Sequence, residues 1–423
     1  MHAHRRDFLK SSLAASTLVS LGAATVPTFV GRSARAVGVD PASGSNDRIL
    51  VVVQLVGGND GLNTVVPHGL EGYNRHRRRL RLPTGQLHKI NEDISLHPSM
   101  SRFADLLEAG RLSVVQGVGY PNPDRSHFRS MEIWETARTD NERDAIETGW
   151  LGRVLDAEPP TPGRDSPALH IGAGRLPLAF RSKRVEVPAL ESLDQFRLRL
   201  AGSDVEKRAA RTALDDIARV DRGGDDPLLG FIRRSTLAAY DSSRRLEEVA
   251  QASGGSGGLD YPNFGLARRL ELIAQIIKAG FGTRIYYTSL GGFDTHANQL
   301  GTHAALLNEL TGSIAAFQAD LAEAGQDDRV ALLSFSEFGR RVAENASDGT
   351  DHGAAAPVFV VGPVVQAGLI GEHPSLDDLD DGDLKHHTDF RRVYAALLNQ
   401  WLGIPASSIV GEGFEPLNLL PTV

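Results

Sequence analysis

Apolar runs recur along the chain, and polar turns separate them. ILVVVQLV and LSVVQGVG are continuous and rich in β-branched residues, which is typical of strands buried on both faces. TRIYYTSL, RVALLSFSEFG and PVFVVG predict three further strands, and ALHIG and LPLAF predict two shorter ones. The pattern therefore predicts a sheet with a buried interior.

Helical patterns alternate with these runs. SRFADLLEAGRL, HAALLNELTGSIAAFQADLAEAG and TDFRRVYAALLNQWLG predict helices, and another helix is expected to start near Ser126. This alternation predicts an α/β fold, a three-layer sandwich with a mostly parallel central sheet, and a helical insertion at about 190–280. The basic segment YNRHRRRLRLP is expected to lie on the solvated surface.

Residues 1–36 have the composition of an export signal. Arg5 and Arg6 open an R-R-x-F-L-K motif, a weakly apolar run follows, and Ala34-Arg35-Ala36 offers an A-x-A cleavage pattern. We expect a twin-arginine signal peptide that engages the twin-arginine export machinery. An ordinary Sec signal or a retained anchor is the alternative. The mature α/β domain, residues 37–423, would then be periplasmic or extracellular.

Charge and cysteine content exclude several classes of partner and chemistry. Removal of residues 1–36 takes away five basic side chains and one acidic side chain, and leaves 40 Lys and Arg against 52 Asp and Glu. The net charge of −12 argues against nucleic acid and against an anionic membrane as partner. The chain has no cysteine, which excludes disulfides, thiolate metal sites and a cysteine nucleophile.

Acidic residues and histidines follow several of the predicted strands directly. Ligands bind at this edge of open α/β sheets, where the carboxyl ends of the strands meet. Each position alone has an ordinary explanation, such as turn chemistry or helix capping. Their repetition at one edge favours a functional site, whose members are Asn59-Asp60, the segment from Asp124 to His127, Asp294-Thr295-His296 and Asp351-His352, with His386-His387 as a possible fifth place.

Carboxylates and imidazoles at one edge are suited to metal-assisted hydrolysis. They are ligands of zinc, with Mn²⁺ as an alternative where carboxylates dominate. Two metal ions could hold the attacking and leaving oxygens of a phosphate or sulfate ester. Ser126 is the candidate nucleophile, because a metal-bound serine is activated and the helix behind it offers N–H groups to an anion. Arg129, one helical turn further on, is the candidate anion-binding residue.

Six motifs together resemble the family called domain of unknown function 1501, a family of secreted bacterial proteins. They are the twin-arginine leader, GGNDGLNT, PDRSHFRS, GGFDTHANQ, SEFGRR with GTDHG, and TDFRRVYAALL. The resemblance covers nearly all of the mature chain. That family in turn resembles the alkaline phosphatase and sulfatase superfamily, which implies an alkaline phosphatase-like fold with a bimetal site.

The superfamily resemblance assigns roles to individual residues. Asp60, Asp351 and His352 would hold the metal nearest the nucleophile Ser126. The second metal would be held by Asp294, His296 and His387, for which His303 and His386 are alternatives at two of the positions. The middle pair departs from the superfamily's D-x-x-x-H spacing, because this chain has D-x-H. The chain also lacks the Cys or Ser frame of a formylglycine sulfatase.

These observations predict a secreted metal-dependent hydrolase of phosphate or sulfate esters with a serine nucleophile. Its cofactor would be one or two divalent metal ions, with zinc favoured and Mn, Mg or Ca as alternatives. The substrate would be an anionic ester, either a small molecule or part of a polymer. The alternative hypothesis is a non-catalytic secreted protein for binding or cell-surface assembly, which keeps the fold with a degraded metal site.

Overall fold

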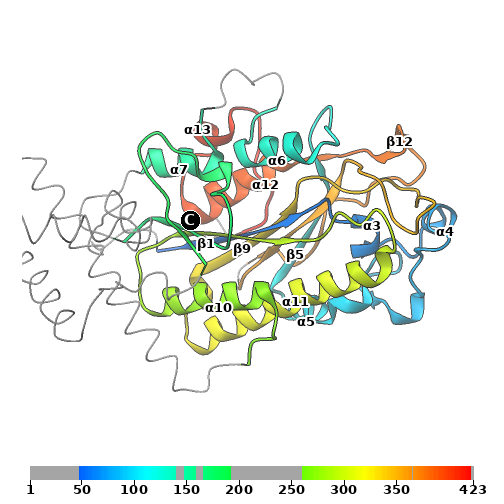
Figure 1. Cartoon of the computed structure of the whole chain (residues 1–423), viewed down its shortest axis with the longest axis horizontal. Coiled ribbons are helices and arrows are strands. Elements are labelled where there is room, and N and C mark those ends of the chain that lie inside the picture. Colours follow the sequence, from blue (N-terminus) through cyan, green and yellow to red (C-terminus); the bar gives the residue numbers. More distant parts are fainter. Residues whose placement is uncertain (1–46, 140–146, 159–164, 192–259, 364, 421–423) are drawn as a thin grey trace, which may run out of the picture.

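The computed structural model describes residues 47–139, 147–158, 165–191, 260–363 and 365–420 (Figure 1). Residues 1–46 lie outside this part of the chain, so the twin-arginine signal remains a prediction. Most of the expected helical insertion, residues 192–259, also lies outside the described ranges. Within these ranges, no helix is both long enough and apolar enough to span a bilayer.

A nine-stranded sheet forms the centre of the described molecule. Its strands are β1 (Ile49–Val56), β5 (Leu112–Gly119), β6 (Ala168–Ile171), β7 (Ala189–Leu190), β8 (Ile285–Gly291), β9 (Val330–Ser336), β10 (Ala356–Val361), β11 (Gly368–Ile370) and β14 (Thr388–Asp389). The strand order is β11-β5-β10-β9-β1-β8-β6-β7, and β14 pairs with β5. The predicted strands ILVVVQLV, LSVVQGVG, TRIYYTSL, RVALLSFSEFG, PVFVVG and ALHIG are therefore confirmed.

The sheet is parallel except at β10. β1 pairs in parallel with both β8 and β9, and β10 pairs antiparallel with both β9 and β5. Because β10 opposes two neighbours, β5 runs in the same direction as β9. The carboxyl ends of β1, β5, β8 and β9 therefore meet at one edge of the sheet, as the sequence predicted.

The prediction of a strand at LPLAF is wrong. Residues Leu178–Phe180 form the 3-10 helix η4. Pro177 begins this turn, and its carbonyl accepts a hydrogen bond from the amide of Phe180 at 3.0 Å. The backbone of the segment thus bonds to itself and adds no strand to the sheet.

Two layers of helices cover the sheet, one on each face (Figure 1). One layer contains α5 (Ser101–Glu108), α10 (Gly265–Lys278) and α11 (Gln299–Glu323). The other contains α6 (His127–Thr136), α7 (Trp150–Ala157), α12 (Phe390–Ala396), the π-helical η7 (Leu397–Leu402) and α13 (Ser407–Val410). The predicted three-layer α/β class with a mostly parallel sheet is confirmed.

Short elements complete the fold, and several of them lie near the carboxyl edge of the sheet. They are α3 (Gly61–Thr64), α4 (Glu71–His76), η1 (Thr84–Gln86), η2 (Pro98–Met100) and η6 (Asp327–Arg329), the small sheet of β2 (Val65–Val66), β3 (His88–Lys89) and β4 (Ser95–Leu96), and the pair β12 (Leu379–Asp380) and β13 (Asp383–Leu384). Figure 1 shows α3, α4 and β12 together at the end toward which β1 points.

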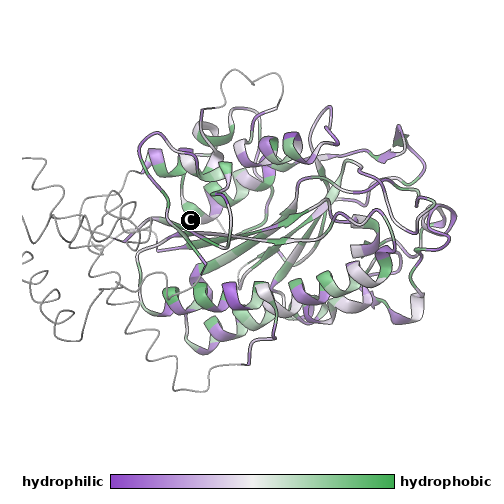
Figure 2. Ribbon diagram, viewed as in Figure 1, coloured by the Kyte–Doolittle hydropathy of each residue, from purple (hydrophilic) through white to green (hydrophobic). Residues whose placement is uncertain are grey.

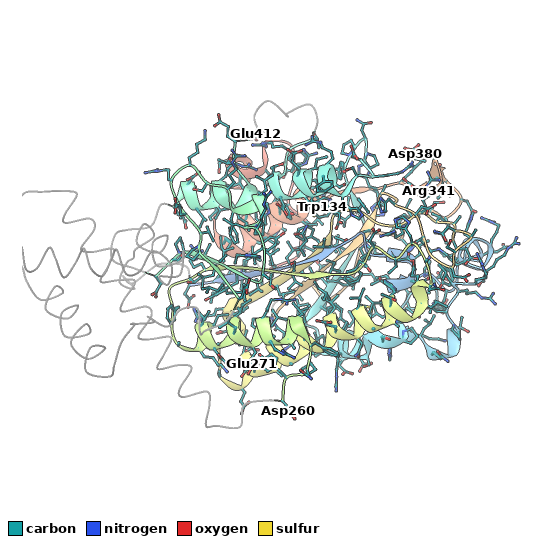
Figure 3. All side chains as sticks on the ribbon, in the orientation of Figure 1. Trp134, Asp260, Glu271, Arg341, Asp380 and Glu412 are labelled. Carbon is teal, nitrogen blue, oxygen red and sulfur yellow. The ribbon has the colours of Figure 1, made fainter. Side chains whose placement is uncertain are left out.

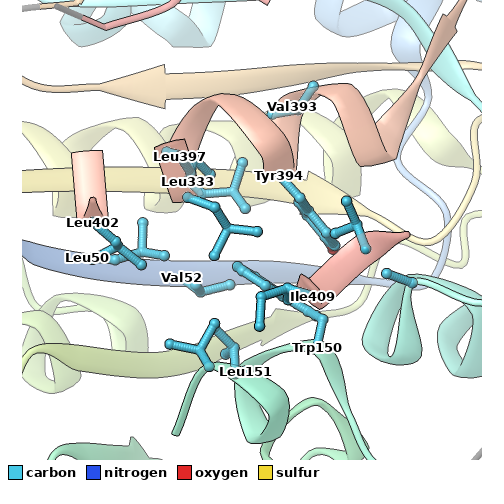
Figure 4. Packing of buried hydrophobic residues seen from close by; sticks show 14 of the residues in the cluster. Leu50, Val52, Trp150, Leu151, Leu333, Val393, Tyr394, Leu397, Leu402 and Ile409 are labelled. Carbon is cyan, nitrogen blue, oxygen red and sulfur yellow. The ribbon is translucent and has the colours of Figure 1, made fainter. Parts of the chain in front are cut away.

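The alternation of side chains along β1 divides the core into two halves. Leu50 and Val52 pack among Trp150, Tyr394 and other residues of one helical layer (Figure 4). Val51 and Val53 pack on the other face, against α10 and α11. Figure 2 shows the strands as predominantly hydrophobic, with hydrophilic residues on the outer surfaces of the helices. Burial on both faces explains why the strand sequences are continuous apolar runs.

Aromatic packing anchors α6, the helix that carries the first candidate site residues. Trp134 stacks on Phe335 of β9 and on Phe390 of α12, with ring centroids 4.9 and 4.4 Å apart. Such pairs each contribute about 0.5–1.5 kcal/mol beyond their buried area. Figure 3 shows Trp134 between α6 and the sheet. This packing fixes the position of the helix whose first turn holds Ser126 and His127.

Candidate metal centre

A glycine turn after β1 allows the site to assemble. Gly57 has φ +121°, and a Cβ atom built on it would lie 2.4 Å from the amide nitrogen of Asp294. Only glycine combines this backbone angle with such a close approach of another chain segment. The GGND turn therefore brings the loop after β8 against the end of β1.

Four side chains from three separate segments converge beside this turn. His127 begins α6, Asp294 and His296 follow β8, and His352 precedes β10. One ligand atom each from His127, Asp294 and His352 lies within 4.8 Å of the other two. His296 Nε2 lies 3.0 Å from Asp294 Oδ1 and 2.9 Å from His352 Nε2. We call these four residues the His–Asp cluster.

Each histidine of the cluster has its Nδ1 atom engaged elsewhere. His352 Nδ1 lies 2.8 Å from the carbonyl oxygen of Arg125, and His127 Nδ1 lies 2.8 Å from Glu337 Oε1. His296 Nδ1 lies 3.3 Å from Asp351 Oδ1. Because carbonyl and carboxylate oxygens accept hydrogen bonds, each Nδ1 carries the hydrogen. In a neutral ring the Nε2 atom is then left with a lone pair, and the Nε2 atoms of His296 and His352 face each other at 2.9 Å.

The Nε2 atoms meet the carboxylate of Asp294, to which neutral rings of this tautomer donate no hydrogen. His352 Nε2 lies 3.1 Å from Asp294 Oδ1, and His127 Nε2 lies 3.6 Å from Asp294 Oδ2. The buried Nε2 of His127 has no hydrogen-bond partner among the described residues. Acceptors packed together in this way require a cation or additional protons between them.

The separations in the cluster fit a metal ion. Four of the pairs of ligand atoms are 2.9, 3.0, 3.1 and 3.6 Å apart, and the ligand atoms that all lie within 4.8 Å of one another are those of His127, Asp294 and His352, without His296. Four ligands at the corners of a tetrahedron, each about 2.0–2.1 Å from zinc, would be about 3.3 Å apart. Histidines whose second nitrogen donates to a carboxylate or carbonyl are also typical of metal sites. The donor set and the orientation of its members both match.

Arg340 contacts the cluster from its buried side. Its fully buried guanidinium donates to Asp294 Oδ1 at 2.8 Å and to the carbonyls of Gly57, Gly58, Phe293 and Thr350. Partial burial raises the pKa of Asp294, but the hydrogen bond from Arg340 and the neighbouring charges outweigh it and lower this pKa to about 2. Asp294 is therefore a carboxylate at any physiological pH.

Glu337 holds His127 from the end of β9. This buried carboxylate accepts hydrogen bonds from His127 Nδ1, from the Gly57 amide at 2.8 Å and from Ser336 Oγ at 3.1 Å. The hydrogen bond to Glu337 raises the pKa of His127. The ring of His127 also packs between His352 and Phe338, with centroids 4.4 and 4.9 Å away. These contacts fix the direction in which His127 Nε2 points.

The cluster opens to solvent on one side. Asp294 is 49% exposed and His296 is 44% exposed, whereas Glu337 and Arg340 are buried. Phe128, the residue after His127, is 86% exposed. A small molecule could therefore reach the cluster from outside the protein.

Ser126 lies at this opening, directly before His127. It is exposed and occupies the N-cap position of α6, but its hydroxyl makes no capping hydrogen bond. Its amide instead donates to Asp124 Oδ1 at 2.7 Å. Helix capping, the structural explanation for a serine at this position, therefore does not apply to this exposed residue, which directly precedes His127 of the cluster.

Asp60, a predicted metal ligand, lies outside the cluster. It is fully buried, and its two oxygens bind Nη1 and Nη2 of Arg77 at 2.5 and 2.9 Å. Burial opposes ionisation, but Arg77 outweighs it and lowers the pKa of Asp60. The predicted surface position of segment 73–83 is wrong at Arg77, which is 0% exposed. This ion pair occupies the carboxylate that was expected to bind metal.

His387, its alternative His386, and His303, the alternative to His296, also lie apart from the cluster. His387 Nε2 contacts the carbonyl of Glu372 at 2.6 Å, and its ring covers Gly117. His386 packs against Gly119. His303 is buried, and its Nε2 lies 2.9 Å from Asn59 Oδ1. None of the three contacts Asp294.

Asp351 and Arg129 have different surroundings from those predicted. Asp351 Oδ1 contacts His296 Nδ1 and accepts a hydrogen bond from Asn345 at 3.1 Å, so it orients a member of the cluster. Arg129 is buried, and its guanidinium pairs with Glu132. The predicted anion-binding arginine therefore does not face solvent at the site.

The sequence hypothesis did not select three residues that shape the cluster: His127, Glu337 and Arg340. His127 stands in PDRSHFRS, where Ser126 was preferred as the functional residue. Glu337 and Arg340 stand in SEFGRR at the end of a predicted strand. An acid and an arginine that directly follow a buried strand at the ligand-binding edge are the signal that could have identified them.

The fold and the site define an α/β protein with a candidate metal centre at the carboxyl edge of its sheet. The chain belongs to the family described as Protein of unknown function (DUF1501), whose model matches residues 47–400. This confirms the family resemblance found in the sequence. No curated protein matches the chain significantly.

Three solved bacterial structures are similar to this chain at low identity. The lipoteichoic acid synthase LtaP from Listeria monocytogenes is 11% identical, with a TM-score of 0.38, over 93% of this chain and 82% of that one. The periplasmic domain of EcEptC from Escherichia coli, in complex with Zn, is 10% identical, with a TM-score of 0.37, over 76% and 74%. An alkaline phosphatase superfamily protein from Vibrio parahaemolyticus is 10% identical, with a TM-score of 0.34, over 84% and 72%. Values this low transfer no residue role or activity.

Proposed function

We propose that this protein is a metal-dependent hydrolase of phosphate or sulfate esters, with one metal ion held by the His–Asp cluster. The observation that supports this proposal is the convergence of three imidazole Nε2 atoms on Asp294 while each Nδ1 is bound to an acceptor. The substrate class rests on the motif resemblance and on the exposed serine beside the cluster.

The donor set favours zinc among the metals considered. His127 and His352 would supply nitrogen and Asp294 would supply oxygen, and His296 offers a further nitrogen 3.0 Å from Asp294 Oδ1. Zinc binds such mixtures, whereas Mg²⁺ and Ca²⁺ prefer sites made of oxygen atoms. A bound divalent ion would supply Lewis-acid chemistry, polarising an ester oxygen and lowering the pKa of a nearby hydroxyl. Asp60 is engaged by Arg77, so we propose one ion per chain.

Ser126 is the proposed nucleophile. Its hydroxyl is exposed, is free of the capping role, and precedes a cluster residue in the chain. Attack would form a bond from Ser126 Oγ to phosphorus or sulfur as the bond to the alcohol oxygen breaks, and the alcohol would leave with the serine proton. Water would then cleave the serine ester. The first-turn N–H groups of α6 would stabilise the charge on the ester oxygens.

The alternative function is binding or cell-surface assembly without catalysis. It is favoured by one observation: Asp60 and His387, two of the six predicted ligands, are engaged elsewhere, so a complete bimetal set is not assembled. In either case we propose that the protein is exported by the twin-arginine pathway and acts in the periplasm or outside the cell. Its ligand would be an anionic ester, either small or polymer-borne.

The test is metal analysis combined with a substrate screen. The protein, purified after native export, should contain about one zinc per chain and should hydrolyse members of a panel of phosphate and sulfate mono- and diesters. Ser126→Ala should keep the metal and lose the activity, whereas His352→Ala should lose both. Wild-type protein that is inactive on the whole panel and free of metal would contradict the proposal. Metal-loaded but inactive protein would favour the alternative function.

A further inference from the structure

Gln299 connects the two loops that carry the His–Asp cluster. It is the first residue of α11 and is fully buried. Its Oε1 atom accepts hydrogen bonds from Thr295 Oγ1 at 3.1 Å and from Thr350 Oγ1 at 2.7 Å. Its Nε2 atom donates to Asp60 Oδ2. One side-chain amide thus touches three segments of the protein.

The two threonines are next to cluster residues. Thr295 stands between Asp294 and His296, and Thr350 is two residues before His352. The backbone joins the same loops, because the Thr350 amide donates to the Thr295 carbonyl at 3.2 Å. A movement of the Gln299 amide would therefore displace both loops that supply ligand atoms.

The orientation of the amide is determined by Asp60. A carboxylate can only accept, so Nε2 of Gln299 must face Asp60, and Oε1 must then face the threonine hydroxyls. Asp60 itself is held by both Nη atoms of Arg77, whose guanidinium also donates to the carbonyls of Val342 and Arg341. The Gln299 amide is thus bound to a buried carboxylate whose two oxygens are also paired with Arg77.

We propose that Gln299 is a positioning residue for the His–Asp cluster. Its amide is held by the Asp60–Arg77 pair, and it in turn holds the two ligand loops in the arrangement that binds metal. Asp60 keeps a role at the metal centre without being a ligand. This inference rests on the metal-binding part of the proposed function and does not depend on the identity of the ester. Outer residues that orient metal ligands typically change the affinity by about 10–100-fold.

The chain offers a matched control on the same helix. Gln318 is also buried on α11, but neither of its amide atoms has a hydrogen-bond partner among the described residues. Gln299→Leu and Gln318→Leu therefore make the same chemical change at two buried glutamines. Only the first change removes hydrogen bonds to the loops of the cluster.

The experiment measures Zn²⁺ affinity of the purified full chain by competition with a chelator, and the visible absorption of the Co²⁺-loaded protein. Gln299→Leu should bind Zn²⁺ about 10–100-fold more weakly and shift the Co²⁺ bands, whereas Gln318→Leu should match wild type. Thr350→Val, which removes one hydroxyl, should weaken binding less. The exchange Asp60→Asn with Gln299→Glu keeps an amide opposite a carboxylate and should recover part of the affinity.

Three outcomes would overturn the inference. Equal Zn²⁺ affinity of Gln299→Leu and wild type overturns it alone, as does an equal loss in Gln318→Leu, which would show a general effect on α11. If Gln299→Leu does not fold, an unchanged affinity in Thr350→Val decides against the inference. Wild-type protein that binds no Zn²⁺ contradicts the proposed function itself, so the two failures are distinguishable.

Discussion

Asp60 and Asp294 are carboxylates in equivalent places with opposite surroundings. Each follows a parallel strand at the same edge of the sheet, Asp60 after β1 and Asp294 after β8. Asp60 is completely buried, and both of its oxygens bind the guanidinium of Arg77. Asp294 is half exposed and has one arginine contact together with the Nε2 atoms of three histidines.

The difference shows that the nearest cation decides what a strand-end carboxylate does. A protein arginine supplies a permanent positive charge and satisfies Asp60 within the fold. The histidines around Asp294 direct lone pairs at it, because each Nδ1 has an acceptor behind it. Asp294 also accepts from Arg340, and the imidazole nitrogens around it would be satisfied by a cation or by additional protons, whereas both oxygens of Asp60 are paired within the fold. The following predictions test this contrast from the largest expected effect to the smallest.

The first prediction concerns the buried ion pair. Arg77→Leu would leave Asp60 charged and unpaired in the interior, which typically destabilises a protein by about 3–5 kcal/mol. The free energy of unfolding, measured by urea titration, should fall by this amount. Adding Asp60→Asn should recover much of the loss because the buried charge is then removed.

An exposed arginine provides the control for this substitution. Arg75 pairs with Asp377 on the surface, where both side chains are largely exposed. Arg75→Leu should change the free energy of unfolding by about 1 kcal/mol or less, since solvent screens such pairs. A loss in Arg77→Leu no larger than that in Arg75→Leu would show that Asp60 is not held as described.

The second prediction compares two histidines. His127→Ala removes a member of the cluster and should weaken Zn²⁺ binding by more than the roughly 10–100-fold expected for an outer residue. His387→Ala removes a histidine that the sequence had assigned to metal but that contacts Glu372, and its zinc content should equal that of wild type. Elemental analysis of both variants checks the prediction. Loss of zinc in His387→Ala alone would favour the ligand set expected from the sequence.

Sequence patterns predicted the sheet and its functional edge because both depend on local regularity. Continuous apolar runs identify buried strands, and parallel strands necessarily bring their carboxyl ends together. Asp294, His296 and His352 were therefore placed correctly at one edge. The antiparallel direction of β10 left no comparable local signal, because its run PVFVVG is as apolar as those of the parallel strands.

The full membership of the His–Asp cluster could not be predicted from local patterns because it depends on pairing at long range. Arg77 stands in a basic segment that is otherwise typical of a solvated surface, and nothing near it in the sequence indicates that it is buried against Asp60. His127 belongs to the cluster only because Glu337, which is 210 residues away, accepts from its Nδ1. The chemistry of each residue is visible in the sequence, but its partner is not.

The third prediction adds Glu135, a carboxylate that pairs with no cation among the described residues. Glu135 of α6 accepts from the amide of Leu178, and burial raises its pKa to about 7. An acid whose pKa is raised by folding contributes its full stability below the unfolded pKa, and that contribution is lost as the pH rises through the folded pKa. We expect the free energy of unfolding to fall between about pH 4.5 and pH 7, by on the order of 3 kcal/mol from this residue.

The test of Glu135 is a comparison with its amide. Glu135→Gln cannot ionise, so urea titrations from pH 5 to pH 8 should show a smaller decline than in wild type and a more stable variant at pH 8. Parallel curves for the two proteins would contradict the assignment. Comparison of Glu135 with Asp60, which pairs with Arg77, shows the effect of a paired cation on a buried carboxylate.

The last prediction concerns Asp351, which sits behind the cluster and not in it. It is 58% exposed and contacts His296 Nδ1 at 3.3 Å. Asp351→Asn keeps an oxygen acceptor there but removes the charge, and solvent screens much of the difference, so Zn²⁺ affinity should fall by less than about 10-fold. The Zn²⁺ affinity of Asp294→Asn, which replaces a carboxylate of the cluster itself, should fall much further. Equal losses in the two variants, measured by the same chelator competition, would make Asp351 a direct ligand. An outer role would instead mean that only one of the two adjacent residues Asp351 and His352 provides an atom to the metal, and that the other determines the direction in which His296 points.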